Sequence, residues 1–336
     1  MESREIFNFL FTLHSLSPLY FFCMKPSEIF INQYGNVRSG WRFAIFLFSF
    51  VFLGSLVGVT AEFLLSKQTA DFGAESWLFI AVNSLLSFLT VVLLGWLCGK
   101  YLEKLPFRAL GVWFTKNWLK DFGLGLFLGA AALAFAVLIA IIFGGLSFDF
   151  NQASGSSAIW LTLGVSLIVF VIGAAFEEAL FRGYILQTFA RAKLAWLAIA
   201  LTSLFFALAH LSNENATYLS SLNTALAGVW FGVAYLKTRT LWFVFGLHLA
   251  WNWFQGAIFG IEVSGITSLT VAPLLRETDA GPIWLTGADY GIEGGIVCTV
   301  ALVFSIILIW FLPILKPTEE MLALTNTEGT SGAERI

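Results

Sequence analysis

The amino-acid sequence predicts an all-α fold, a polytopic membrane helix bundle with about eight transmembrane helices. Of the 336 residues, 58% are hydrophobic and only 12% are charged, whereas a typical soluble domain carries about 25% charged residues. The chain also contains 36 Phe and 13 Trp, which one soluble core could not enclose. The net charge of −3 excludes a basic nucleic-acid-binding protein. Three cysteines without a CxxC spacing exclude a disulfide framework or a thiolate zinc site.

Long apolar stretches place the individual helices. A helix needs about 20 mostly apolar residues to cross the hydrocarbon core of a bilayer. Eight stretches approach or exceed this length, at 43–65, 77–99, 122–144, 158–189, 194–211, 218–236, 241–260 and 292–315. The fourth is unusually long and contains no proline or glycine pair that would end it, so we expect a single tilted or kinked helix there.

Lysine and arginine predict the orientation, because cytoplasmic loops of membrane proteins are enriched in both. With the N-terminus inside, sixteen of these residues fall in the inner segments, and the outer loops contain only Lys67 and Arg276. The sequence therefore predicts a multi-pass protein of the cell membrane with both termini in the cytosol.

The flanking segments are expected to lie outside the 43–315 membrane domain. Residues 1–42 form a cytosolic or interfacial segment, in which 1–23 suit the interface better than a ninth span. Aromatic and basic residues are interspersed over 100–121, which predicts an interfacial helix on the inner leaflet. Residues 316–336 are polar and are expected to be a disordered cytosolic tail.

Two glycine pairs have the spacing of closely packed helices. Gly125 and Gly129 are four residues apart, as are Gly228 and Gly232. Small residues at this spacing let two helix backbones approach, so both pairs predict helix contacts inside one bundle.

Ionisable residues inside the apolar stretches are the candidate functional residues, because they are costly at membrane depth unless paired. They form three short motifs, which are Glu177-Glu178-xxx-Arg182, Phe206-xxx-His210 and His248-xxx-Asn252. At 1.5 Å of rise per residue from the cytosolic helix ends, Glu177, His210, His248 and Asn252 lie about 12–24 Å deep. We therefore expect three separate helices to bring them into one layer near the middle of the membrane.

These residues differ in the partners that the sequence offers them. Glu178 and Arg182 are four residues apart on one helix and suit a structural ion pair with a supporting role. Glu177 has Phe181 at the same spacing and so lacks a helical partner. A glutamate and a histidine that face one water can share general acid–base work, and a second histidine with an amide can stabilise an oxyanion.

A metal site is the alternative chemistry for the same residues. Glu177, His210 and His248 would be a three-ligand zinc set with one position open for water. Other protease signatures are missing, since the sequence has no HExxH motif and every aspartate falls near a loop. We favour the metal-free version, because no acidic residue on the fifth or seventh span is available to orient a ligating histidine. The cofactor is therefore none or a divalent metal such as zinc.

The three motifs together resemble the CPBP family of intramembrane proteases, which includes type II CAAX prenyl endopeptidases and bacteriocin-processing or ABI-like immunity proteins. The similarity is densest over about 165–260. Softer similarities at Gly35–Phe43 (GNVRSGWRF) and Leu285–Gly294 (LTGADYGIEG) extend it over most of 35–315.

The resemblance implies an intramembrane endopeptidase whose site opens to the cytosol. Glu177 and His210 would activate water, while His248 and Asn252 would be oxyanion stabilisers or a metal ligand and its partner. The implied partners are a peptide or membrane-protein substrate and the lipid bilayer, without nucleic acid. A non-catalytic immunity or scaffold protein and a small proton-coupled transporter are the alternative functions.

Overall fold

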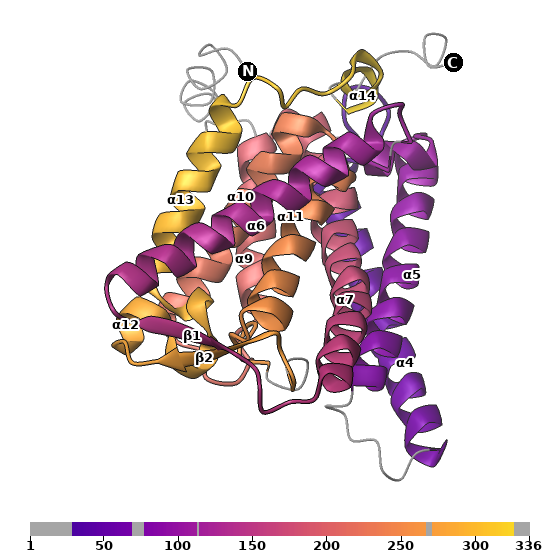
Figure 1. The fold of residues 1–336 in the computed structure, drawn as a ribbon. Helices are drawn as coiled ribbons and strands as arrows, with labels where there is room; N and C mark the ends of the chain where they lie inside the picture. The colour runs from indigo at the N-terminus through magenta and orange to yellow at the C-terminus, as the bar shows by residue number, and fades with distance from the viewer. Residues whose placement is uncertain (1–28, 69–76, 113, 267–270, 326–336) are drawn as a thin grey trace.

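The predicted all-α membrane fold is confirmed by a computed structural model, which describes residues 29–68, 77–112, 114–266 and 271–325 (Figure 1). Its helices run up and down around a common core, and α6 crosses one face of the bundle diagonally. The elements are α4 (Ser39–Gln68), α5 (Trp77–Leu102), the 3-10 helix η1 (Phe107–Leu110), α6 (Trp118–Ile142), β1 (Leu146–Phe150), α7 (Ser156–Glu178), the π-helix η2 (Ala179–Ile185), α8 (Leu186–Arg191), α9 (Ala195–Ala209), α10 (Tyr218–Thr238), α11 (Leu241–Trp253), the π-helix η3 (Phe254–Ile258), β2 (Leu275–Asp279), α12 (Ile283–Thr286), the 3-10 helices η4 (Ala288–Tyr290) and η5 (Ile292–Gly294), α13 (Ile296–Phe311) and α14 (Glu319–Thr325).

Each of the eight predicted spans contains a helix, but only some of these helices have the length of a membrane crossing. In the described residues, five helices are long and apolar enough, at Ser39–Phe63, Leu78–Leu102, Trp118–Ile142, Ser156–Arg191 and Tyr218–Thr238. The remaining three, α9, α11 and α13, have 15, 13 and 16 residues. The structure therefore supports an integral membrane protein, and the count of eight crossings stays a prediction.

The fourth predicted span is a single long helix, as expected. It runs from α7 through η2 into α8, from Ser156 to Arg191. The seven residues of η2 have π-helical hydrogen bonds, and such wide turns are frequent at functional sites within α-helices. The irregularity begins directly after Glu178, so the acidic pair lies at the end of the regular part of the helix.

The glycine pairs pack helices together as predicted. An added Cβ would lie 2.1 Å from the Phe243 backbone oxygen at Gly125 and 2.2 Å from the Leu247 oxygen at Gly129. At Gly246 of α11, an added Cβ would lie 2.5 Å from the Phe122 oxygen of α6. The backbones of α6 and α11 therefore touch, which fixes the helix that carries His248.

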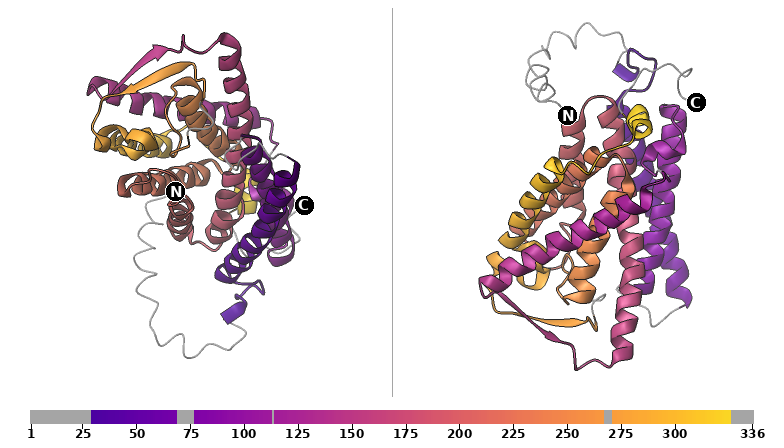
Figure 2. Two further views of the ribbon diagram at one scale, coloured as in Figure 1. Left: turned by 90° about the horizontal axis from the view of Figure 1, so that it is seen from below. Right: turned by 45° about the horizontal axis from the view of Figure 1, so that its top comes forward.

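A two-stranded antiparallel ladder closes one end of the bundle and was not predicted from the sequence. Strands β1 and β2 pair from Leu146 opposite Asp279 to Phe150 opposite Leu275, at the lower end in Figure 1. The turns at the opposite end contain many basic residues, among them Lys104, Lys193 and Arg239. Figure 2 shows the same separation of the ladder from that end. This distribution is what the positive-inside rule requires, although the side of the membrane stays a prediction.

Two predictions for the flanking segments are wrong. The interfacial helix expected over 100–121 is replaced by η1, because Lys104 and Gly111 adopt φ values of 56° and 94° that interrupt a helix on either side of Pro106. The tail expected to be disordered contains α14, whose Met321 and Leu324 are buried. The prediction for residues 1–23 falls outside the described residues.

Candidate active site

The predicted site residues lie on four elements that share the core. Glu177 and Glu178 end α7, and Arg182 lies in η2. His210 caps the C-terminus of α9, and His248 and Asn252 lie one turn apart on α11. The sequence motifs therefore come from the ends or the middle of helices that pack around one polar cluster.

Glu178 is the centre of that cluster. Its Oε1 accepts hydrogen bonds from Arg182 Nη1 at 3.1 Å and from His248 Nδ1 at 2.8 Å. The three side chains are 2%, 0% and 5% exposed. The predicted pair with Arg182 is thus present, and the contact with His248 adds a link between α7 and α11 that sequence spacing could not reveal.

Glu177 occupies a more open position beside the same histidine. Its Oε2 lies 3.8 Å from His248 Nε2, beyond hydrogen-bonding distance, and 26% of its side chain is exposed. Among the described residues, Oε2 of Glu177 and Oε2 of Glu178 are buried without a hydrogen-bond partner. Buried acceptors of this kind are normally satisfied by water or by a ligand, so the space next to His248 suits a molecule that donates hydrogen bonds.

Aromatic rings enclose the charged groups. His248 stacks on Phe231 with 4.6 Å between ring centroids. The guanidinium carbon of Arg182 lies 4.9 Å from the Phe231 centroid and 5.1 Å from that of Phe206. These cation–π contacts stabilise the arginine away from water. No sequence pattern pointed to Phe231. Phe206 was part of the Phe206-xxx-His210 motif, but the sequence did not show what its side chain does.

His210 joins the cluster through Phe206 rather than by a direct bond. Its Nδ1 lies 2.8 Å from the Phe206 carbonyl oxygen, and the two rings are 4.7 Å apart. A carbonyl oxygen can only accept, so Nδ1–H is the donor, and in the neutral ring Nε2 is then an acceptor. The Phe206 ring also lies 6.2 Å from that of His248. The one-turn spacing of the motif therefore fixes both the ring and the proton position of His210.

An acidic loop residue near His210 was missed as a site neighbour. Glu293 in η5 accepts hydrogen bonds from the Ser264 backbone N–H at 2.6 Å and from the Ser264 hydroxyl at 2.8 Å. His210 lies close enough for its charge to act on Glu293. Asn213, three residues after His210, donates to the Ser264 carbonyl oxygen at 2.9 Å. The loop before α13 thus holds the chain around His210. In the sequence, the resemblance over 285–294 was what indicated that this loop could matter for the site.

The geometry does not assemble the alternative metal set. Within the part of the chain that the structure describes, no three His, Cys, Asp or Glu side chains are grouped so as to hold a metal ion. Glu177, His210 and His248 are not grouped in this way in the structure, and the zinc site stays a hypothesis. The lack of an acidic residue on the fifth and seventh spans does not leave His248 without one, because a carboxylate from another helix orients it. It is Glu178, and it comes from α7 rather than from the helices that carry the histidines.

Comparisons with known proteins agree with the motifs. The family model described as type II CAAX prenyl endopeptidase Rce1-like matches residues 158–254. Uncharacterized protein YyaK of Bacillus subtilis (strain 168) is 29% identical over 231 residues, which cover 64% of this chain and 70% of YyaK. No solved structure matches the chain significantly. Residues 158–254 carry all six candidate site residues, so the part of the chain that is similar to the type II CAAX prenyl endopeptidase Rce1-like family is the part that contains the candidate site.

Proposed function

We propose that this protein is a membrane endopeptidase that hydrolyses a peptide bond with a water molecule activated at Glu177. The observation that carries the proposal is the position of His248 between two carboxylates. Glu178 binds its Nδ1, and Glu177, the more exposed of the two glutamates, faces its Nε2 across 3.8 Å. One carboxylate thus has a structural partner, and the other is available for chemistry.

Glu177 acts as the general base in this proposal. It takes a proton from water as the water oxygen attacks the peptide carbonyl carbon, and that proton passes to the departing amine when the carbon–nitrogen bond breaks. His210, with Nε2 available as an acceptor, assists in orienting the water. The membrane-embedded position excludes bulk water, which strengthens each electrostatic interaction in the site.

His248 and Asn252 stabilise the oxyanion. Held by Glu178 through Nδ1–H, a doubly protonated His248 offers Nε2–H to the developing negative charge. The Asn252 amide, one helical turn away, is the second donor. Arg182 acts through Glu178 and does not touch the substrate.

The test compares cells that carry the wild type with cells that carry Glu177→Gln, which keeps the shape but removes the base. Membrane proteomics should detect a peptide or membrane protein that accumulates uncut in the variant. We expect turnover to fall by about 10²–10⁴-fold, with unchanged amounts of inserted protein. Glu320→Gln, on the exposed face of α14, is the matched control.

An identical set of cleaved peptides in wild type and Glu177→Gln would refute the proposal. If the variant also kept the cellular phenotype, a non-catalytic immunity or scaffold role would take its place. We also propose that the basic end of the bundle faces the cytosol. Reporters fused after residue 110, 192, 239 or 320 should then read inside, and those after 150 or 280 outside, whereas an outside signal at 110 would overturn the orientation.

A further inference from the structure

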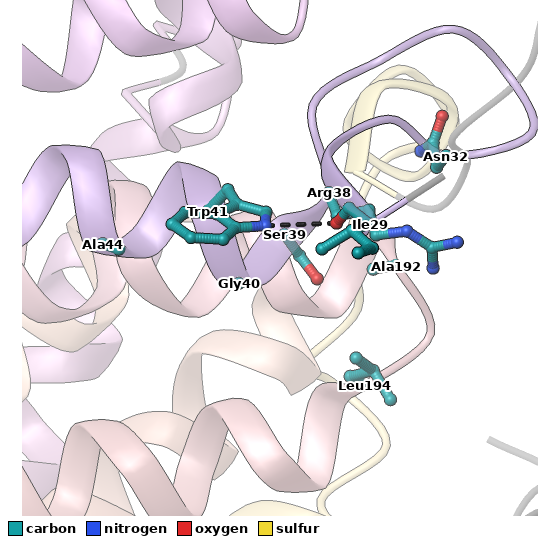
Figure 3. A pocket seen from close by; sticks show the side chains of 9 residues that line it. All are labelled: Ile29, Asn32, Arg38, Ser39, Gly40, Trp41, Ala44, Ala192 and Leu194. Atoms are coloured by element: carbon teal, nitrogen blue, oxygen red, sulfur yellow. Dashed lines mark hydrogen bonds between the residues drawn. The ribbon is translucent and has the colours of Figure 1, made fainter. Parts of the chain in front are cut away.

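The hollow drawn in Figure 3 lies apart from the candidate site. It has a volume of about 550 Å³ and is found where the chain enters α4, at the point where Trp41 Nε1–H donates to the Ile29 carbonyl oxygen at 3.1 Å (Figure 3). None of the six candidate site residues lines it. Space for a substrate therefore lies elsewhere, and α7 offers it one turn before Glu177.

Gly173 of α7 is four residues before Glu177 and shares its face of the helix. Among the described residues, no side chain and no neighbouring helix lies within 4 Å of the position that a Cβ at Gly173 would take. Gly173 is near the midpoint of the helix from Ser156 to Arg191, about 25 Å from each end at 1.5 Å per residue. The structure therefore leaves room beside the middle of this helix.

This room is on the inward side of α7. Residues three, four and seven positions before Gly173 lie on the same face of the helix. They are Phe170, Val169 and Ser166, which are 6%, 3% and 1% exposed. Gly173 itself is half-buried. The space at Gly173 therefore follows a row of packed residues and leads to Glu177.

Gly164 of the same helix is in the opposite situation. A Cβ there would also meet no described atom within 4 Å, but its neighbours on the helix surface are Trp160, Leu161 and Ile168, which are 73%, 67% and 59% exposed. About two and a half turns separate the two glycines, so they point to opposite sides of α7. The space at Gly164 thus belongs to the lipid-facing surface, whereas the space at Gly173 belongs to the bundle.

Packing between helices does not explain a glycine at position 173. Glycine is the least favourable residue in a helix interior after proline, and at Gly125 and Gly129 it permits the contact of α6 with the backbone of α11. Gly173 has no such contact with any described residue. One turn further on, Glu177 Oε2 is buried without a hydrogen-bond partner in the described part of the chain. Both observations indicate that another molecule approaches α7 here.

We propose that Gly173 makes room for an apolar side chain of the substrate and so determines which peptide bonds can be cut, an inference that rests on the endopeptidase function proposed above. Between Ser156 and Glu177, α7 has no ionisable residue, so an apolar group suits the space better than a charged one. From Gly173 to Glu177 the helix rises by about 6 Å, and an extended peptide advances by about 3.3 Å per residue. The substrate residue beside Gly173 is therefore about two positions from the bond that is cut.

The experiment incubates the purified full-length protein in detergent with a library of peptides from digested membrane proteins, and mass spectrometry identifies the cut sites. The wild type should prefer a large apolar residue at one position near the cut. Gly173→Ala should shift this preference to smaller residues, and Gly173→Leu, which fills the space, should lower kcat/KM for the best wild-type peptide by about 10²-fold. Gly164→Leu adds the same side chain on the lipid-facing side and is the matched control, with unchanged rate and preference.

The melting temperature separates a local effect from a loss of the fold. Alanine and leucine are better helix formers than glycine, so both Gly173 variants should melt no lower than the wild type. If Gly173→Leu does melt lower, Gly173→Ala carries the test, and an unchanged residue preference in that variant overturns the inference.

Failure of this inference can be told from failure of the proposed function. If Glu177→Gln is inactive but Gly173→Leu keeps the wild-type rate and residue preference, Gly173 does not face the substrate and the proposed function stands. If Glu177→Gln cuts the library as fast as the wild type does, the proposed function is refuted, and the role of Gly173 with it.

Discussion

Arg182 gives the most direct test of how the active-site charges are balanced. Its guanidinium is fully buried and binds Glu178 Oε1 at 3.1 Å, so Arg182→Met leaves a carboxylate that is 2% exposed and keeps its hydrogen bond from His248 but loses the guanidinium. Removing one partner of a buried ion pair costs about 3–5 kcal/mol. At about 2–4 °C per kcal/mol, the melting temperature should fall by about 6–20 °C.

Arg108 provides a matched control for the same substitution. It pairs with Glu320 at 2.5 Å, but the two side chains are 47% and 52% exposed. An exposed pair contributes ~0–1 kcal/mol, so Arg108→Met should shift the melting temperature by no more than about 4 °C. Both variants can be measured by temperature-scanning tryptophan fluorescence in detergent.

A second substitution separates charge from packing. Glu178→Gln added to Arg182→Met removes the uncompensated charge and keeps an oxygen that accepts from His248, so much of the lost stability should return. The reasoning is refuted if the double variant melts no higher than Arg182→Met, or if Arg182→Met is no less stable than Arg108→Met.

The remaining predictions concern pH, helix packing and metal. Burial and nearby acidic groups raise the pKa of Glu277 from 4.5 to about 8, so the folded state keeps this carboxyl protonated where the unfolded state does not, and the stability that this provides is lost as the pH rises through about 8. Glu277→Gln should therefore raise the melting temperature much more at pH 9 than at pH 5. An equal effect at both pH values would contradict this. Gly129→Ala should cost ~1–3 kcal/mol of unfolding free energy by forcing α6 from α11, whereas Gly123→Ala, which has open space around it, should be neutral in the same thermal assay. Peptidase activity should survive a strong chelator, and His248→Gln should retain about 10⁻²–10⁻³ of wild-type turnover; stoichiometric zinc in active protein, with no turnover left in the variant, would reverse the metal-free assignment.

Local sequence patterns were sufficient to predict the helices and one contact of the candidate site, the ion pair between Glu178 and Arg182. Long apolar stretches form helices at all eight predicted positions, because a helix satisfies the backbone where burial or lipid excludes water. The Glu178–Arg182 pair follows from i,i+4 geometry alone. The spacing of the glycine pairs was also enough to predict close helix packing, because a position without a side chain lets the backbone of a second helix approach.

Contacts between distant segments were beyond the sequence. Glu178 and His248 are 70 residues apart, and only the packing of α7 against α11 brings them within 2.8 Å. Strand β1 (LSFDF) alternates apolar and polar residues over five positions, but its partner β2 (LRETD) does not alternate, so the sequence did not indicate that the two segments pair. Helix α14 is stabilised by burial of Met321 and Leu324, which depends on the surface beneath it.

In the π-helical turn of the long helix, the number of residues matters as much as which residues they are. A π-turn holds one residue more than an α-turn, so deleting one residue within 179–185 would let the segment rewind as α-helix. Each residue of an α-helix turns by about 100°, and the register of Gln187 and Arg191 relative to Glu177 would change accordingly. Homologous proteins should therefore vary in residue identity across this turn far more readily than in residue number. A one-residue gap there would mark a protein in which Arg191, which binds Glu103, has a different register relative to the acidic pair.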